Sequence, residues 1–351
     1  MTETRRSFGF PLSIAVKTDV GQVRSNNEDS HGHAWLDDGS LFVIVADGMG
    51  GHEAGEVASG LAVRVLEDAV ARDADADPRS RLYHGFLEVN EAIMDEGRRS
   101  GTRGMGTTGV SGILRGNQVH VGLIGDSRLY HVRRGQMVWR TLDHTRVQTL
   151  IDRGEITEEA GRTHPEAGML TRALGHSRMA DGNALVPDVL AEPLVLSEND
   201  VLVFCSDGLH DLADDWEIAK LVSGRTADEA AEILVNLANE RGGHDNITVA
   251  VIVAGDKSDP FDPDYVPPAP EPAPVETERG DAATTLEGPV DDLATATAAP
   301  RPSRPPPGLP APRSGPGIEP WMVVVGVGVL FVFMGGMVFL GVVLGLLLMS
   351  T

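Results

Sequence analysis

Short runs of apolar, often β-branched residues recur through the first 255 residues, and between them apolar residues repeat with the spacing of a helix. The clearest continuous runs are residues 41–46, 119–124, 201–205 and 247–253. Such runs predict buried strands, and the helical stretches predict helices that cover them. Thr226 and Glu229 form a capping box ahead of a further apolar stretch, which predicts a helix start. We therefore predict a globular domain of strands and helices over residues 1–255.

The pattern changes after residue 255. Of the 22 prolines in the chain, 17 lie between Pro260 and Pro320, and aromatic residues are scarce there. A segment of this composition cannot bury enough apolar surface to offset the entropy of ordering it. Residues 256–320 are therefore predicted to form a disordered, Pro-rich linker.

Residues 321–349 form an apolar run without any charged side chain. A hydrocarbon core of about 30 Å needs about 20 such residues, so this run predicts one C-terminal transmembrane helix. The flank that precedes it carries Arg301, Arg304 and Arg313. The positive-inside rule then predicts a single-pass membrane protein whose N-terminal domain is cytoplasmic. Gly341 and Gly345 have the G-x-x-x-G spacing that lets two helices approach closely, so a homodimer through this helix is a further hypothesis.

The formal net charge of −23 argues against nucleic acid as a partner, because nucleic-acid binding needs a basic surface. A solvated acidic surface explains most of this charge, and carboxylates clustered around divalent cations are the sharper hypothesis. The single cysteine, Cys205, excludes an internal disulfide and suits a reducing compartment.

Four aspartates stand at the ends of the apolar runs, three of them beside a glycine. They are Asp47, Asp126, Asp207 and Asp245. Each one alone is typical of a turn or a helix cap. If the strands share sheets, however, these carboxylates collect at one end and repel one another unless cations lie between them. An all-oxygen site of this kind suits Mg²⁺ or Mn²⁺, and two such ions would activate a water and bind phosphoryl oxygens.

A phosphate group also needs a fixed cation to orient it. Arg24 is followed closely by Glu28 and Asp29, and its planar guanidinium can bind two phosphate oxygens at once. Taken alone, Arg24 would equally be an ordinary surface residue.

Six ordered motifs make the chain resemble the bacterial branch of the type 2C, metal-dependent protein phosphatases. They are R-S-N-N-E-D, V-A-D-G-M-G-G-H, G-M-G-T-T, I-G-D-S-R, C-S-D-G-L-H-D and G-G-H-D-N-I-T-V, and the resemblance covers residues from about 12 to 255. The resemblance implies an α+β fold, a four-layer α-β-β-α sandwich of two antiparallel sheets flanked by helices. It also implies hydrolysis of phosphoserine and phosphothreonine on proteins, by direct attack of a metal-bridged hydroxide and without a phosphoenzyme.

The resemblance further implies a role for each matching residue. Two central ions would be held by Asp47, the carbonyl of Gly48, Asp207 and Asp245, with Glu28 and Asp29 acting largely through water. A third, weaker ion would be held by Asp126 and Asp211, and Arg24 would bind the phosphate. Met49 stands where many eukaryotic members have a histidine that serves as the general acid. His52 is then one candidate acid; a metal-bound water is another, and His52 could instead cap a helix.

Residues 143–180 resemble the mobile flap of bacterial members, which would influence the phosphoproteins that fit the site. His164 and Arg172 lie in this segment, where packed or exposed loop residues are the simpler interpretation. Thr107 and Thr108 are expected to support the metal site through strand packing. The partners implied are phosphorylated proteins, namely serine/threonine kinases and their targets. Two alternatives stay open: a metal-dependent phosphoesterase with another substrate, and a non-catalytic pseudophosphatase that binds phosphoproteins.

Overall fold

The computed structural model describes residues 3–5, 9–50, 53–102 and 104–267. The predicted transmembrane segment, most of the predicted linker and His52 lie outside these residues. Among the helices within the described ranges, none is long and apolar enough to cross a membrane.

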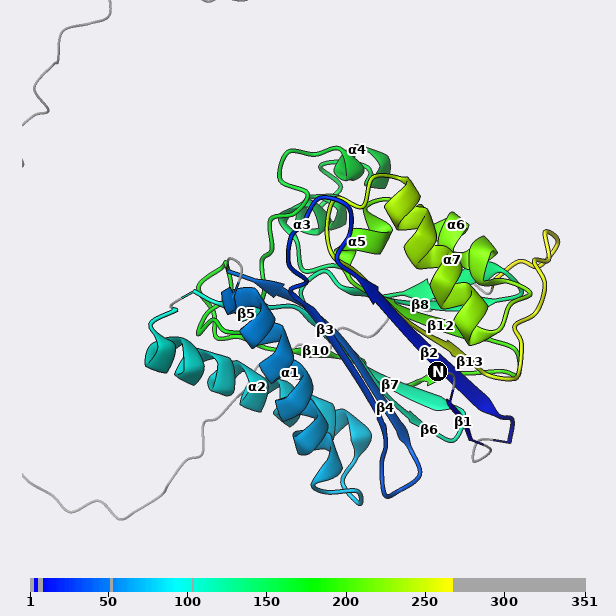
Figure 1. The fold of residues 1–351 in the computed structure, drawn as a ribbon, viewed down its shortest axis with the longest axis horizontal. Coiled ribbons are helices and arrows are strands. Elements are labelled where there is room, and N and C mark those ends of the chain that lie inside the picture. Colours follow the sequence, from blue (N-terminus) through cyan, green and yellow to red (C-terminus); the bar gives the residue numbers. More distant parts are fainter. Residues whose placement is uncertain (1–2, 6–8, 51–52, 103, 268–351) are drawn as a thin grey trace, which may run out of the picture. The chain divides into compact units, whose positions relative to one another are not determined.

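The described residues form two antiparallel sheets and seven helices (Figure 1). The strands are β1 (Glu3–Arg5), β2 (Leu12–Asp19), β3 (Asp29–Trp35), β4 (Leu41–Met49), β5 (Gly106–Thr107), β6 (Gly109–Arg115), β7 (Gln118–Ile124), β8 (Arg128–Arg133), β9 (Gln136–Arg140), β10 (Asp188–Val189), β11 (Leu194–Val195), β12 (Val201–Cys205) and β13 (Ile247–Val253). The helices are α1 (Glu53–Ala71), α2 (Pro78–Ser100), α3 (Arg146–Asp152), α4 (Glu158–Arg162), α5 (Asp207–His210), α6 (Asp215–Val222) and α7 (Ala227–Glu240).

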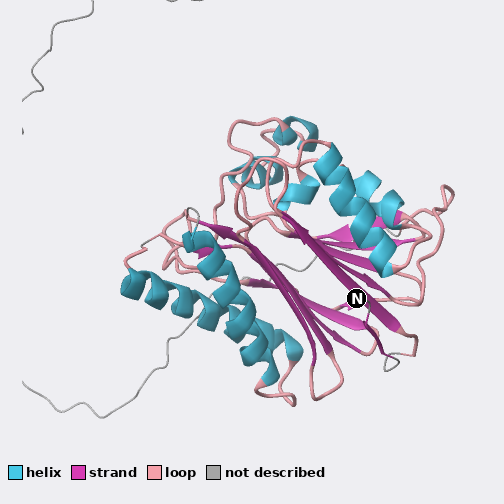
Figure 2. Ribbon diagram, in the orientation of Figure 1, coloured by secondary structure: helices cyan, strands magenta, loops and turns pink. Residues whose placement is uncertain are grey.

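The two sheets pack face to face between helices. One sheet has the strand order β1-β2-β13-β12-β8-β9, and the other has β10-β7-β6-β4-β3, with β11 paired to β7 and β5 to β4. Figure 2 shows α1 and α2 against one sheet and α6 and α7 against the other. The predicted α+β sandwich of two antiparallel sheets flanked by helices is therefore confirmed for the described part of the chain.

Continuous apolar strands follow from this layering, because both faces of each sheet are covered. In β12, Phe204 belongs to the core between the sheets, whereas its neighbour Val203 belongs to the core beneath α6 and α7. In β4, Val43 faces the core between the sheets and Ile44 the core beneath α1 and α2. Successive side chains on a strand point to opposite faces, so only an unbroken apolar run fills two cores at once.

The strand register brings several loops to one end of the sandwich. Asp29 lies opposite Asp47 in the β3–β4 pair. Cys205, at the end of β12, lies between Arg128 at the start of β8 and Val249 of β13. The turn between β7 and β8, the start of α5 and the segment that precedes β13 therefore meet at that end.

Helix α7 begins where the capping box predicts. The Thr226 side chain accepts a hydrogen bond from the Glu229 N–H, and the Glu229 side chain accepts one from the Thr226 N–H. The chain also stays against the domain beyond residue 255, where the predicted linker begins. Ser258 is buried, and its hydroxyl donates to the carbonyl of Val222 at 2.7 Å.

Candidate active site

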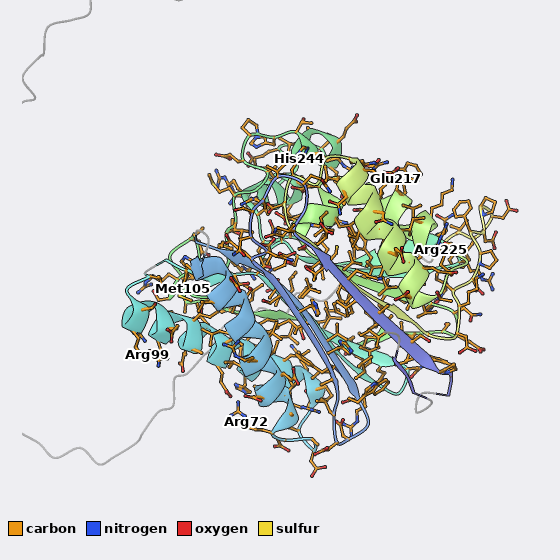
Figure 3. The ribbon with its side chains drawn as sticks, in the orientation of Figure 1. Arg72, Arg99, Met105, Glu217, Arg225 and His244 are labelled. Carbon is orange, nitrogen blue, oxygen red and sulfur yellow. The ribbon has the colours of Figure 1, made fainter. Side chains whose placement is uncertain are left out.

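A group of carboxyl groups meets at the end of the sandwich described above. Burial raises the pKa of Asp47 well above its ordinary value, and the charges of Asp207, Asp29 and Asp126 raise it further. Burial is also the largest cause of the raised pKa of Asp207, and the charges of Asp126, Asp211 and Asp245 raise it further. Figure 3 labels His244, the residue that precedes Asp245 at this end. The structure therefore brings together the aspartates that the sequence places at separate strand ends.

Two further acids of this group have raised pKa values. Burial raises the pKa of Asp29 to about 6, although hydrogen bonds from Thr248 and Ser206 oppose the shift. Burial, with the charges of Asp143 and Asp211, raises the pKa of Asp126 to about 7. Repulsion among these carboxylates, in a site largely shielded from water, destabilises their charged forms, and a bound cation would offset that repulsion.

The oxygens themselves fit divalent cations. Among the described residues, Oδ1 of Asp207 and Oδ1 of Asp29 are buried and make no hydrogen bond to another protein group. A buried carboxylate oxygen without a partner is unfavourable, so these two atoms are available to a metal ion or its water. Within the same residues, no group of three or more Asp, Glu, His or Cys side chains is arranged so that it could hold a metal ion. Mg²⁺ is usually bound by one or two carboxylates and keeps several waters.

Threonines of the β5–β6 segment hold the backbone of Asp47. The Asp47 N–H donates to Oγ1 of Thr108 at 3.0 Å. The carbonyl of Asp47 accepts from Oγ1 of Thr107 at 2.7 Å and from the N–H of Thr108 at 2.9 Å. These contacts fix the main chain from which the Asp47 carboxylate projects, so the threonines support the site by direct hydrogen bonds.

Two glycines that follow acids are required for close backbone approach. A Cβ on Gly48 would lie 2.2 Å from the carbonyl oxygen of Gly55 and 2.5 Å from that of Glu28. A Cβ on Gly208 would lie 2.0 Å from the carbonyl oxygen of Asn246. All three distances are far below van der Waals contact, so only glycine lets these segments pack together.

Arg24 reaches the site from the turn between β2 and β3. Its Nη2 donates to Oδ2 of Asp245 at 2.6 Å, and its side chain is 52% exposed. The structure therefore places the predicted phosphate-binding arginine next to a predicted metal ligand, with about half of its side chain exposed to solvent.

Known proteins decide the family. The family model described as Protein phosphatase 2C matches residues 16–247. The chain belongs to the protein phosphatase 2C family. The serine/threonine phosphatase stp of Listeria monocytogenes is 38% identical over 247 residues, which are 69% of this chain and 95% of that protein.

Solved structures agree. The S. agalactiae serine/threonine phosphatase is 35% identical, with a TM-score of 0.64 over 69% of this chain and 98% of that one. The catalytic domain of the serine/threonine protein phosphatase PstP, solved with two manganese ions, is 34% identical, with a TM-score of 0.60 over 69% of this chain and 97% of that one. The predicted enzyme class, a serine/threonine protein phosphatase, is thereby confirmed. The ions in PstP agree with the predicted use of Mn²⁺ or Mg²⁺.

Sequence reasoning assigned no role to Asn246, which organises the acidic end of this phosphatase. Its Oδ1 accepts from the N–H of Glu28 at 2.8 Å, and its Nδ2 donates to the carbonyls of Val20 and Asn26 at 2.9 Å each. The side chain thus ties the Arg24 turn to the start of β13. Its position directly after Asp245 in the D-N-I-T-V motif was the available signal.

His210 is another residue that the sequence did not single out. Its Nε2 donates to the backbone carbonyl of Asp126 at 2.9 Å, and its side chain is 4% exposed. Burial, then the charge of Arg128, lowers the pKa of His210 to about 3, so the ring is neutral at physiological pH. Asp211, at the end of α5, is 72% exposed and lies in the electrostatic environment of Asp126.

The two flap residues that the sequence highlighted make other contacts. His164 accepts at Nδ1 from the N–H of Glu166 at 3.1 Å, which is a local turn interaction. Arg172 donates from Nη1 to Oδ1 of Asp188 at 2.6 Å. His52, the candidate general acid, lies outside the described residues.

Proposed function

We propose that this chain is a metal-dependent phosphatase that hydrolyses phosphoserine and phosphothreonine on proteins, anchored to the cytoplasmic face of a membrane by residues 321–349. The observation that carries the catalytic part is the group of repelling carboxyls around Asp47 and Asp207, with Arg24 beside it. The family membership and the manganese-containing relative support the same conclusion.

In this proposal each acid binds ions in the way its position allows. Two central ions, Mn²⁺ or Mg²⁺, would be held by Asp47, Asp207, Asp245 and the carbonyl of Gly48. Glu28 and Asp29 would act through water, and Asp126 with Asp211 would hold a third ion. When bound, the ions supply an activated water and neutralise charge on the phosphoryl group.

The remaining residues bind the phosphate or hold the acidic residues in place. Arg24 binds two phosphate oxygens through its open guanidinium edge. Thr107, Thr108 and Asn246 fix the backbone of Asp47 and Glu28. His210 is neutral and holds the Asp126 carbonyl, so it orients that acid and does not transfer a proton.

Substrate selectivity distinguishes this proposal from a phosphoesterase of another class. In Mn²⁺, the full-length protein is expected to release phosphate from a phosphothreonine peptide at a kcat/KM at least about 100-fold above that for a sugar phosphate. Malachite-green measurement of phosphate release tests this. Equal rates on both substrates would favour the broader phosphoesterase, and binding of the peptide without any release would favour the pseudophosphatase.

The membrane part of the proposal rests on the sequence. The apolar run 321–349 and the arginines before it support an anchor with the enzyme on the cytoplasmic side, joined by the Pro-rich stretch between them. A reporter enzyme fused after Thr351 is expected to be active only outside the cytoplasm. Cytoplasmic activity of that fusion would refute the orientation, and recovery of the protein in the soluble fraction would refute the anchor.

The proposed partners are serine/threonine kinases and their phosphorylated targets, and a homodimer through Gly341 and Gly345 is a further part of the proposal. A phosphoproteome that compares the wild-type protein with an inactive variant would identify the targets, because their phosphorylation rises only when turnover is lost.

A further inference from the structure

His144 connects two parts of the molecule that are far apart in sequence. It is buried, with 7% of its surface exposed, and lies at the start of the segment 143–190. Its backbone N–H donates to the carbonyl of Gly125 at 2.8 Å, and its Nδ1 accepts from the N–H of Gly125 at 3.1 Å. One residue thus satisfies both backbone groups of the glycine that directly precedes Asp126.

These bonds determine the state of the ring. A backbone N–H can only donate, so Nδ1 carries no proton, and the proton of the neutral ring is on Nε2. Nε2 lies 2.8 Å from Oδ2 of Asp188 and therefore donates to that carboxylate. The second oxygen of Asp188 accepts from Arg172 at 2.6 Å. The imidazole is a rigid bridge between the Gly125 amide and the Asp188 carboxylate.

The bridge closes the base of the segment 143–190. Asp188 belongs to β10, which pairs with β7, the strand that leads into Gly125. Further along the segment, the N–H of Thr171 donates to the carbonyl of His144 at 2.7 Å. Both ends and the middle of the segment therefore meet at His144, beside the turn that carries Asp126.

Gly125 transmits this position to the central carboxyls. Its φ of +102° is in the region that favours glycine, and a Cβ there would lie 2.6 Å from the side chain of Thr108. Thr108 in turn accepts from the N–H of Asp47 and lies 2.6 Å, Oγ1 to Oγ, from Ser127. A displacement of Gly125 would therefore shift Asp126 and, through Thr108, Asp47.

The segment also borders the site where a substrate would bind. A cleft of about 530 Å³ is lined by Met49, two residues after Asp47, and by Pro165, Glu166, Gly168, Met169 and Leu170 of the segment. The position of the segment relative to β4 therefore sets the width of this cleft.

We propose that His144 is a positioning residue that couples the segment 143–190 to the turn that carries Asp126. Its Nδ1 holds Gly125 and thereby fixes the position of the acidic site. Its Nε2–H holds Asp188 and thereby fixes the position of the segment and the width of the substrate cleft. The inference rests on the proposed function, since it assumes that Asp126 contributes to ion binding. It assigns separate consequences to the two ring nitrogens, and this separation makes it testable.

Two variants separate the nitrogens. The Oδ1 of asparagine can replace Nδ1 as the acceptor for the Gly125 N–H but cannot reach Asp188, so His144→Asn keeps only the first contact. Glutamine can reach Asp188 with its amide N–H but lacks an acceptor at the Nδ1 position, so His144→Gln keeps only the second. Asp188→Ala removes the partner of Nε2–H and also the acceptor of Arg172. Like His144→Asn, it leaves the contact between Nδ1 and the Gly125 N–H in place.

The tests use full-length protein and start with a readout independent of turnover, the hydrogen exchange of the Gly125 amide in the metal-free state. We expect this exchange to accelerate about tenfold in His144→Gln and to change less than about twofold in His144→Asn and Asp188→Ala. The Mn²⁺ concentration for half-maximal phosphate release should rise about tenfold in His144→Gln alone. His144→Asn and Asp188→Ala should instead raise KM for a phosphothreonine peptide with little change in kcat.

The inference is overturned if His144→Gln leaves both the Gly125 exchange and the Mn²⁺ dependence unchanged, or if all variants show the same loss. If His144→Gln does not fold, the contrast between Asp188→Ala and wild type decides, because a changed Mn²⁺ dependence there contradicts the assignment. Failure of the proposed function has a different signature: the wild-type protein then releases no phosphate, while the exchange measurement still reports on His144.

Discussion

Replacing Asp207 by asparagine is expected to remove nearly all phosphate release while it raises the thermal stability of the metal-free protein. The loss should exceed the roughly 100-fold that even outer partners of metal ligands can cost, because in the proposed site Asp207 is a direct ligand. The gain arises because the Asp207 carboxylate repels the neighbouring acids and keeps one buried oxygen without a hydrogen-bond partner among the described residues. An unsatisfied buried group costs about 1–3 kcal/mol, and each kcal/mol corresponds to about 2–4 °C in Tm.

Asp256→Asn is the matched control for Asp207→Asn, because Asp256 is exposed and lies in the loop that follows the last strand. It should leave the rate and the Tm of the metal-free protein unchanged. Activity of Asp207→Asn within about twofold of wild type would show that Asp207 is not a metal ligand. A Tm several degrees below that of wild type would show that the residue mainly stabilises the fold.

The second large expected effect is that bound metal reverses the direction in which the stability of the protein changes with pH. A carboxyl whose pKa is higher in the folded than in the unfolded protein binds its proton more tightly when folded, so protonation favours the folded state. The pKa of Asp126 is raised to about 7 and that of Asp29 to about 6, and Asp47 and Asp207 shift in the same direction. The metal-free protein should therefore gain stability as the pH falls from about 7.5 to about 5.5.

Saturating Mn²⁺ should invert this trend, because cations bind the deprotonated carboxylates and protons compete with them. Below the ordinary range of aspartate pKa values, stability should fall in both states. Burial raises the pKa values of Asp38 and Asp200, but hydrogen bonds from their neighbours lower them below the ordinary value. The donors are Ser40 and Arg81 for Asp38, and Arg133 and His131 for Asp200. The stabilisation that these hydrogen bonds give to the folded state is lost when the aspartates are protonated. Differential scanning calorimetry at both pH values, with Mn²⁺ and with chelator, measures the effect. A metal-free Tm that falls steadily from about pH 7.5 to about 5.5 would contradict the description of the acidic group.

The strands could be predicted well because the fold buries both of their faces. The run 247–253 matches β13 residue for residue, and 201–205 matches β12. An uninterrupted apolar segment of this length needs no knowledge of its neighbours to be identified as a buried strand. The aspartates at the ends of these runs could be identified in the same way, since a charged residue that stops an apolar strand is visible in the local sequence.

The supporting contacts could not be predicted, because they join residues that only the folded topology brings together. Ser206 donates to Oδ2 of Asp29 at 2.7 Å across a sequence separation of 177 residues. Asn246 contacts the N–H of Glu28 across 218 residues. No local periodicity encodes such pairs, and serine or asparagine in a turn has a sufficient local explanation. The same reason hid the bridge from Gly125 through His144 to Asp188.

The C-terminal boundary of the domain could not be predicted from composition either. Proline content predicts that the linker starts at residue 256, yet the Asp262 N–H donates to the carbonyl of Arg134 at 2.9 Å. Phe261 lies against Gly135, where a Cβ would come within 2.8 Å of its ring. Individual packing contacts of this kind decide where a domain ends, and an averaged composition does not register them.

The central claim is that the acidic end of the sandwich binds divalent cations in order to hydrolyse phosphoproteins. Its most direct test is the rate of phosphate release from a phosphothreonine peptide by the full-length protein, measured as Mn²⁺ is added to the metal-free enzyme and then removed by chelator. We expect no release without metal, saturable release with Mn²⁺ and complete loss in chelator that fresh Mn²⁺ reverses. Release at the same rate in chelator, or no release at any Mn²⁺ concentration, would contradict it.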